Sequence, residues 1–121
     1  MNYIRLFATP DGESRFETKQ TALGPVELAH GNMLIEMSAP TAVAQMTYFH
    51  LHEGWFQDWH CGPQRQFVIV HRGTMHIETS DSGKFRIGPG DTLLVEDISG
   101  KGHRTTVPVG DCWGVVVTIP D

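Results

Sequence analysis

The alternation of apolar and polar positions along the chain predicts short β-strands. Residues 66–78 predict two strands joined by a turn at Arg72–Gly73. Because side chains alternate between the two faces of a strand, Gln66 and His71 point to opposite faces of the first one. If Gln66 faces the interior of a barrel, His71 is therefore expected on its outside.

The same pattern predicts strands elsewhere in the chain, and Tyr3–Phe7 has the composition of an edge strand. In the run Ala42–His52, His50 and His52 share one face. The aromatic stretch Glu53–Trp59 is predicted as a turn, and its rings need cover from a pocket or from a partner. The other predicted strands are Ser14–Thr18, Met33–Met37, Lys84–Ile87, Thr92–Val95 and Cys112–Ile119.

Turn-forming residues separate these strands. The chain has 13 glycines and 7 prolines, and the turn Gly88–Asp91 leads the chain into an apolar strand. Short strands between such turns, with few segments of helical period, indicate an all-β architecture. The length of 121 residues fits one domain, 1–121, that is large enough to bury a core.

The charge and the apolar content of the chain exclude several classes of protein. The net charge is −5, and the 9 lysines and arginines are scattered, whereas phosphate binding draws on clustered basic residues. No apolar run approaches the about 18 residues of a membrane span, and Met1–Glu13 lacks the apolar core of a signal peptide. Cys61 and Cys112 are too few for a disulfide framework. We therefore expect a cytoplasmic protein that binds neither nucleic acid nor membrane.

Two stretches of the chain resemble the sequence motifs of the cupin superfamily. The first cupin motif reads roughly G-x5-H-x-H-x3,4-E-x6-G, and residues 59–73 resemble it. His60 stands at the first histidine, Gln66 at the glutamate and Gly73 at the closing glycine, while Gly62 occupies the place of the second histidine. The resemblance implies a small cupin barrel, which is a jelly roll or double-stranded β-helix.

The second cupin motif reads G-x5-P-x-G-x2-H-x3-N, and Gly90 opens the matching stretch. Gly100–His103 reproduces the glycine-to-histidine ending after two inserted residues, while Glu96 stands at the proline and Val107 at the asparagine. The stretches WHCGPQRQFVIV and LLVEDISGKGHRT also resemble a subgroup of small, single-domain bacterial cupins. Together the two motifs cover about half of the chain.

The resemblance implies that His60, Gln66 and His103 converge on one cavity and hold a divalent metal, which would be iron, manganese, nickel or zinc. Two imidazoles and one amide bring no charge, so the ion would be weakly held. A pocket without metal is an equal alternative. In that pocket His103 is the candidate proton shuttle, and Glu96 is the candidate catalytic carboxylate, with Asp97 as the other choice.

Further candidate residues flank this set. The candidate substrate-binding residues at the cavity mouth are Trp59, Cys61 and Gln64. His50 and His52 form a rival metal-binding pair, because the H-x-H spacing lets both rings reach one ion. Metal binding by either set, the three cavity residues or this pair, would make the protein a metal-binding protein.

Two classes of function follow. The first is an enzyme, assisted by a divalent metal, that acts on a small polar substrate in the barrel. The second is a metal-free module that binds or senses a small-molecule ligand, which the same fold supports. A homodimer is expected in either case, because an N-terminal edge strand and the aromatic turn both need cover.

Overall fold

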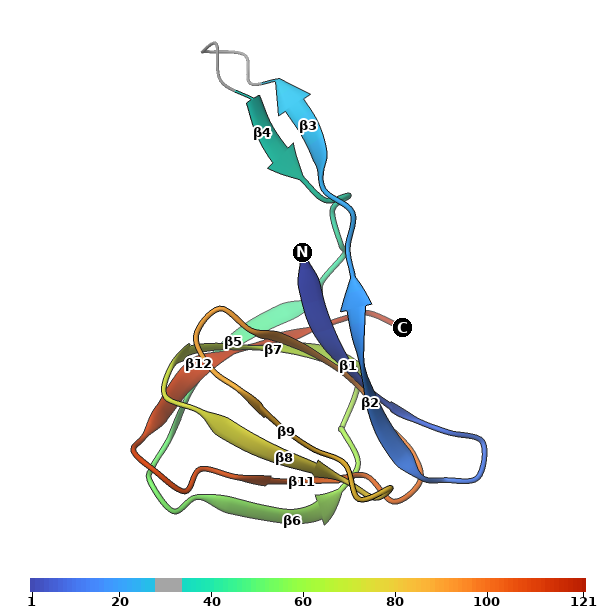
Figure 1. Cartoon of the computed structure of the whole chain (residues 1–121), viewed down its shortest axis with the longest axis vertical. Helices are drawn as coiled ribbons and strands as arrows, with labels where there is room; N and C mark the ends of the chain where they lie inside the picture. The colour runs from blue at the N-terminus through green and yellow to red at the C-terminus, as the bar shows by residue number, and fades with distance from the viewer. Residues whose placement is uncertain (28–33) are drawn as a thin grey trace.

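The computed structural model describes residues 1–27 and 34–121, which form strands and connecting turns without a helix (Figure 1). The prediction of an all-β architecture is confirmed. Met33, in the predicted strand Met33–Met37, lies outside the described residues. The strands are β1 (Asn2–Ala8), β2 (Ser14–Gln20), β3 (Gly24–Glu27), β4 (Leu34–Met37), β5 (Gln45–Leu51), β6 (Phe56–His60), β7 (Gln66–Arg72), β8 (Met75–Thr79), β9 (Lys84–Ile87), β10 (Thr92–Glu96), β11 (His103–Thr106) and β12 (Cys112–Thr118).

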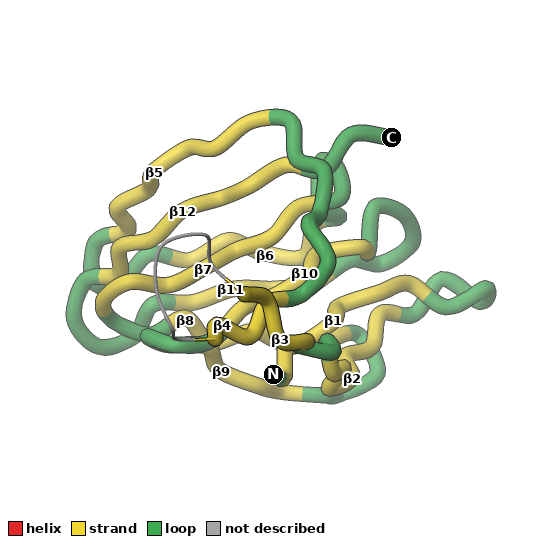
Figure 2. Tube along the Cα trace, turned by 90° about the horizontal axis from the view of Figure 1, so that it is seen from above, coloured by secondary structure: helices red, strands yellow, loops and turns green. Residues whose placement is uncertain are grey.

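Two facing sheets make up the body of the molecule (Figures 1 and 2). One has six strands in the order β2-β1-β10-β7-β12-β5, and the other has four in the order β6-β11-β8-β9. β1 runs parallel to β10, whereas β10 is antiparallel to β7. Among the described residues no strand ladder joins the two sheets. We use the word barrel for these sheets and the space between them.

The alternation seen in the sequence explains which side chains fill the barrel. In β7, Val68 and Val70 are buried whereas His71 is exposed, as their parity predicts. Burying an aliphatic side chain of this size contributes roughly 1.5–3 kcal/mol. Other side chains of the core cluster are Leu6, Met75, Ile77, Ile87, Leu93, Val95, Val107 and Cys112. The core therefore draws on both sheets.

Two local predictions were wrong. Tyr3–Phe7 is not an edge strand, because β1 lies between β2 and β10. Its Leu6 is completely buried in the core, and a strand at that depth satisfies its backbone groups by pairing on both sides. The stretch Glu53–Trp59 is not a turn throughout, since β6 begins at Phe56 and pairs with β11. Phenylalanine and tryptophan favour strands, so the aromatic residues there extend the four-stranded sheet.

A hairpin of β3 and β4 projects from the barrel (Figure 1). The two strands pair with each other and join neither of the larger sheets. We call residues 24–27 and 34–37 the arm. The exposed apolar side chains of the arm are Val26, Leu34, Ile35 and Met37, which are 42%, 66%, 41% and 49% exposed. The arm thus carries apolar surface away from the core.

Candidate functional site

A cavity of about 210 Å³ lies between the two sheets. This volume is below the roughly 300–1,000 Å³ of sites for drug-sized molecules, so the cavity suits a small ligand. Most of its wall is apolar, formed by Phe49, Leu51, Trp55, Val68, Met75, Ile77, Leu93, Val95 and Val116. Its polar side chains are Gln57, His60, Gln66, His103 and Thr105. The structure therefore brings His60, Gln66 and His103 to one cavity.

The pairing of β6 with β11 places the two histidines side by side. His60 and His103 are cross-strand partners, with ring centroids 4.5 Å apart and an interplanar angle of 57°. The register then shifts, and the next cross-strand pair is Thr105 with Gln57. A β-bulge of this kind inserts one extra residue and changes the parity of the strand. Gln57 and His60 can therefore both line the cavity although three positions separate them.

The backbone carbonyl of Asp58 fixes which nitrogen of His60 carries the hydrogen. Nδ1 of His60 lies 2.7 Å from the carbonyl oxygen of Asp58. A carbonyl oxygen only accepts, so Nδ1 must donate, and in the neutral ring Nε2 then keeps its lone pair. Because His60 lines the cavity, this lone pair is available to a ligand there.

Asp97 orients His103 from within the barrel wall. Its Oδ2 lies 2.5 Å from Nδ1 of His103, and the two residues are 0% and 7% exposed. With Nδ1–H donating to the carboxylate, His103 also keeps a lone pair on Nε2. The second oxygen, Oδ1, has no hydrogen-bond partner among the described residues. Burying a carboxylate is costly unless it is hydrogen-bonded, so the contact with His103 is what stabilises Asp97 in this position.

Glu96 does not contact His103, in contrast to the expectation from sequence. Its carboxylate accepts hydrogen bonds from Nε of Arg5 at 2.6 Å and from Nε of Arg65 at 2.7 Å. Burial alone would raise the pKa of Glu96, but the two arginines outweigh it and hold this pKa below its ordinary value of 4.5. Neighbouring residues of an extended chain point to opposite faces. Asp97, the alternative carboxylate, therefore faces the core, and Glu96 faces away from it.

The three residues expected at the cavity mouth are not part of the described cavity wall. Trp59 is 42% exposed, and the guanidinium of Arg104 lies 5.1 Å from its ring centroid. As the neighbour of His60 in β6, Trp59 points to the opposite face. Cys61 is half-buried, and its Sγ donates to a backbone carbonyl of the loop before β11. Gln64 is exposed in the turn that precedes β7.

Sequence reasoning missed Gln57 and Thr105 as cavity residues, and it left open whether the rings of the stretch with Trp55 cover a pocket or contact a partner. Thr105 lies two positions after His103 in β11, so alternation alone could have placed it on the same face. Gln57 lines the cavity because of the bulge in β6, for which the sequence gives no local signal. Trp55 precedes β6 and supplies one of the cavity's aromatic walls.

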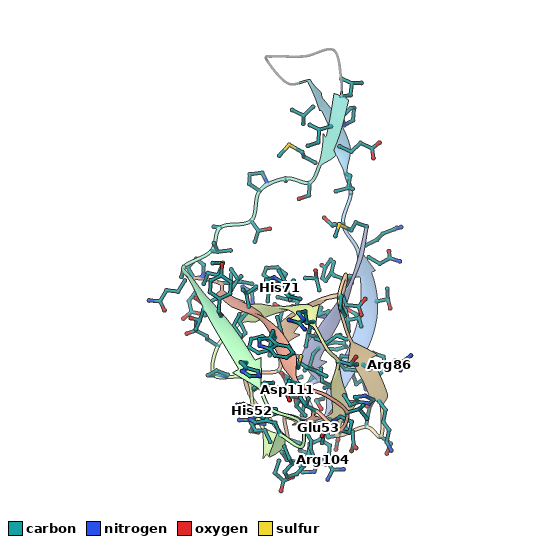
Figure 3. The ribbon with its side chains drawn as sticks, turned by 90° about the vertical axis from the view of Figure 1, so that its left-hand side faces the viewer. His52, Glu53, His71, Arg86, Arg104 and Asp111 are labelled. Carbon is teal, nitrogen blue, oxygen red and sulfur yellow. The ribbon has the colours of Figure 1, made fainter. Side chains whose placement is uncertain are left out.

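The rival pair, His50 and His52, does not reach the cavity. In β5 it is Phe49 and Leu51 that line the cavity, so the intervening His50 points to the outer face. His52 follows the end of the strand and is exposed. Figure 3 shows His52 beside Asp111, and the stick view places His71 apart from them. The H-x-H pair therefore belongs to the outer surface.

No family model matches the chain, and no curated protein matches it. Among solved structures, a cupin 2 conserved barrel domain protein from Leptotrichia buccalis is similar, with a TM-score of 0.52 and 18% identity over 78% of this chain and 44% of that chain. Protein NMB1881 from Neisseria meningitidis has a TM-score of 0.51 and 20% identity over 62% of this chain and 72% of that one.

A further similar structure is the conserved SPY1581 protein of unknown function from Streptococcus pyogenes, with a TM-score of 0.51, 17% identity and coverage of 84% of this chain and 97% of that one. The chain spans 44% of the length of the Leptotrichia buccalis protein. At these identities the likeness establishes the fold. The protein has the fold of a small cupin barrel, as the sequence motifs implied. In the described part of the chain no helix could cross a membrane.

Proposed function

We propose that this protein is an enzyme that acts on a small molecule, and that its barrel cavity binds a divalent metal ion through His60 and His103. The carrying observation is that Nδ1 of each ring is engaged by an oxygen, the carbonyl of Asp58 for His60 and the carboxylate of Asp97 for His103. This arrangement leaves both Nε2 lone pairs to the cavity. Metal-binding histidines are characteristically oriented by such a hydrogen bond at the other ring nitrogen.

The donor set fits an ion of moderate affinity. Gln66 on β7 adds an amide oxygen to the two imidazoles, and nitrogen and oxygen donors of this kind suit iron, manganese, nickel or zinc. All three donors are neutral, so the ion would be weakly held and would keep positions open for a substrate. When bound, the ion would act as a Lewis acid that polarises an oxygen of the substrate.

The rest of the cavity defines the class of substrate. Gln57 and Thr105 can supply hydrogen bonds next to the two histidines, and the rest of the wall is aliphatic and aromatic. We therefore infer a small substrate with an oxygen-containing polar end and a compact apolar part. Asp97 holds the ring of His103 in the orientation that binding of the ion at Nε2 requires.

A metal-free function is the second candidate, and the lining of the cavity favours it in one respect. None of the described lining residues is a carboxylate, so an ion would find no negative charge in direct contact. Without an ion, Nε2 of His103 would be free to accept a proton, and His103 and Asp97 would form an acid–base pair facing a small pocket. The protein would then bind or sense a small ligand through hydrogen bonds to His60, His103 and Gln66.

We also propose that the protein resides in the cytoplasm. Both cysteines are free, Cys61 half-buried and Cys112 fully buried. Unpaired thiols of this kind support a reducing compartment.

Replacing Asp97 with asparagine tests the proposed role of this carboxylate. An asparagine amide can donate to Nδ1 of His103, which moves the ring hydrogen to Nε2 and removes the lone pair that faces the cavity. We expect the affinity of the barrel for Ni²⁺ to fall by about 10- to 100-fold, as for other groups that orient a ligand. A titration followed by the paramagnetic broadening of the backbone amide signals of β11 measures this affinity at the site itself.

The matched control is Glu96→Gln, which removes the neighbouring carboxylate. Glu96 binds Arg5 and Arg65 instead of a histidine, so the broadening of the β11 signals should be as in the wild type. Imidazole nitrogen NMR provides a second readout, because Asp97→Asn should exchange the tautomer of His103 and Glu96→Gln should not. If both variants bind Ni²⁺ like the wild type, Asp97 has no part in the site.

We propose further that the protein forms a homodimer through the arm. An isolated two-stranded hairpin is marginally stable in water, and this one exposes four apolar side chains. The outer face of β5 exposes two more, Met46 at 58% and Tyr48 at 71%. Since one chain carries both surfaces, a second copy can cover the arm of the first and receive cover in return, as two-fold symmetry requires.

Light scattering at micromolar concentration should give the mass of a dimer for the wild type. The double variant Val26→Asp, Ile35→Asp places charges on both strands of the arm, so it should give a folded monomer. Val109→Asp is the matched control, because Val109 is 79% exposed in the loop before β12; this variant should remain dimeric. A monomeric wild type, or dissociation by the control, would contradict the proposed interface.

A further inference from the structure

Three potential metal ligands lie close together on the outer surface of the barrel. Nε2 of His50 is 2.8 Å from Oδ2 of Asp111, and Nδ1 of His52 is 3.6 Å from the same oxygen. The ligand atoms of the three residues all lie within 4.8 Å of one another. His50 comes from the outer face of β5, His52 follows that strand, and Asp111 precedes its neighbour β12. The pairing of Leu51 with Cys112 brings these two strand ends together.

The surrounding structure holds two of the three ligands in place. Oδ1 of Asp111 accepts a hydrogen bond of 2.9 Å from the backbone N–H of Glu53, and the Glu53 carboxylate accepts one of 2.6 Å from the backbone N–H of Gly110. These bonds tie the loops after β5 and before β12 together; Figure 3 shows His52, Glu53 and Asp111 grouped at this end of the sheet. His50 stacks on Trp113 with ring centroids 4.5 Å apart and an interplanar angle of 11°.

The separations between the ligand atoms suit a shared ion. Zinc binds imidazole nitrogen and carboxylate oxygen at about 2.0–2.2 Å, so two such ligands on one tetrahedral or octahedral ion are about 3 Å apart. The N–O distances of 2.8 Å and 3.6 Å lie on either side of this value. His52 is 80% exposed and can close the remaining gap by rotating its side chain.

The charge at the site also favours a cation. Asp111 is a carboxylate whose Oδ1 accepts the backbone N–H of Glu53 and whose Oδ2 faces His50. Asp111 therefore brings a negative charge that the barrel cavity does not offer. Two imidazoles and one carboxylate are a set that selects zinc, nickel, cobalt or iron over magnesium and calcium, which prefer oxygen ligands.

We propose that His50, His52 and Asp111 form a second divalent-metal site, outside the barrel and independent of the cavity. It would take a transition-metal ion of the zinc and nickel class and leave at least one coordination position open to solvent or to another ligand. The hydrogen between Nε2 of His50 and Oδ2 of Asp111 would move to Nδ1 of the neutral ring, and the ion would take its place and link the end of β5 to the start of β12.

The test is a titration of the full chain with Ni²⁺, followed by broadening of individual backbone amide signals. The amides of His50, His52 and Asp111 should broaden at a lower Ni²⁺ concentration than those of β11, since only the outer site has a charged ligand. His52→Ala should lower the affinity of the outer site by 10-fold or more. Because His52 is 80% exposed, this variant should keep its fold, and a competition titration with Zn²⁺ should show the same loss.

His76→Ala is the matched control, because His76 is an exposed histidine on β8 in the other sheet. It should leave the affinity of the outer site unchanged. An equal affinity in the wild type and His52→Ala, or an equal loss in both variants, would overturn the proposal. The amides of β11 report on the barrel site separately. The result at the outer site can therefore be interpreted even if the barrel binds no ion, and the result at the barrel site even if the outer site binds none.

Discussion

Replacing His103 with alanine should remove most of the divalent-ion binding in the barrel. His103 supplies one of the three ligands proposed for this ion, and the other two, from His60 and Gln66, are also neutral, so the site has little affinity to spare. We expect a loss of more than about 100-fold, which exceeds the loss for a group that only orients a ligand. The measurement is a Ni²⁺ titration read from the amide signals of Gln66 and Thr105, which line the cavity from opposite sheets.

Two further variants, His60→Ala and His71→Ala, are needed to interpret that result. His103→Ala leaves the buried Asp97 without its partner and will therefore lower the stability, so its fold is checked by the dispersion of its amide spectrum. His60→Ala removes a ligand whose Nδ1 bonds only a backbone carbonyl, and it should show a loss of similar size. His71→Ala is the control, since His71 is exposed on the opposite face of the strand that carries Gln66. Equal ion binding in all of these variants would refute the barrel site.

Replacing Gly102 with alanine should strongly destabilise the protein. The loss should exceed that of the same change at a positive-φ glycine with free space around its Cβ position. Gly102 has a φ of +73°, and a Cβ atom there would lie 2.1 Å from the carbonyl oxygen of His60. The left-handed conformation alone costs a residue with a side chain roughly 1–2 kcal/mol. The backbone clash comes in addition, so we expect a loss of at least about 4 kcal/mol in the free energy of unfolding.

Gly90→Ala is the matched control for this experiment. Gly90 has a φ of +93°, but apart from Gly90 and its two chain neighbours no described residue has an atom within 4 Å of the position of its Cβ. It should lose only the roughly 1–2 kcal/mol of the backbone conformation. Urea denaturation of the two variants measures the difference. Similar losses would mean that the approach of Gly102 to His60, which sets the spacing of the two histidine-bearing strands, is not tight.

The fold could be predicted from sequence because its signals are local. The turn Gly88–Asp91 and the alternation in residues 66–78 are properties of short stretches, and both appear in the structure as expected. The position of β1 could not be obtained this way. Whether a strand lies at the edge of a sheet depends on which distant strand pairs with it, here β10, and alternation carries no information about that partner.

The candidate site could be predicted in part. The family motifs placed His60, Gln66 and His103 together, and the structure brings all three to one cavity. The choice of Glu96 as the catalytic carboxylate overlooked the parity of β10. Extending the alternation of the buried Leu93 and Val95 by two positions leads to Asp97, which contacts His103.

The residues of β6 that point into the cavity could not be predicted, because a β-bulge sets which of its side chains face inward. The pattern of residues 53–59 predicts a turn, in which the side chain of Trp59 has no defined direction. The structure makes most of this stretch a strand, and the shift of register between β6 and β11 sends Gln57 inward. Trp59 instead packs beneath Arg104 on the outside. A bulge results from the fit between two strands, so neither strand's sequence reveals it alone.

A titration of the wild-type protein with Mn²⁺, followed through the nitrogen signals of the histidine rings, shows whether His60 and His103 present their Nε2 atoms to one ion in the barrel. Nε2 of His60 and Nε2 of His103 should broaden together and at the same ion concentration, while the ring signals of His71 and His76 should stay sharp. Persistence of both Nε2 signals at millimolar Mn²⁺, or broadening of only one of them, would contradict the binding of one ion by both rings.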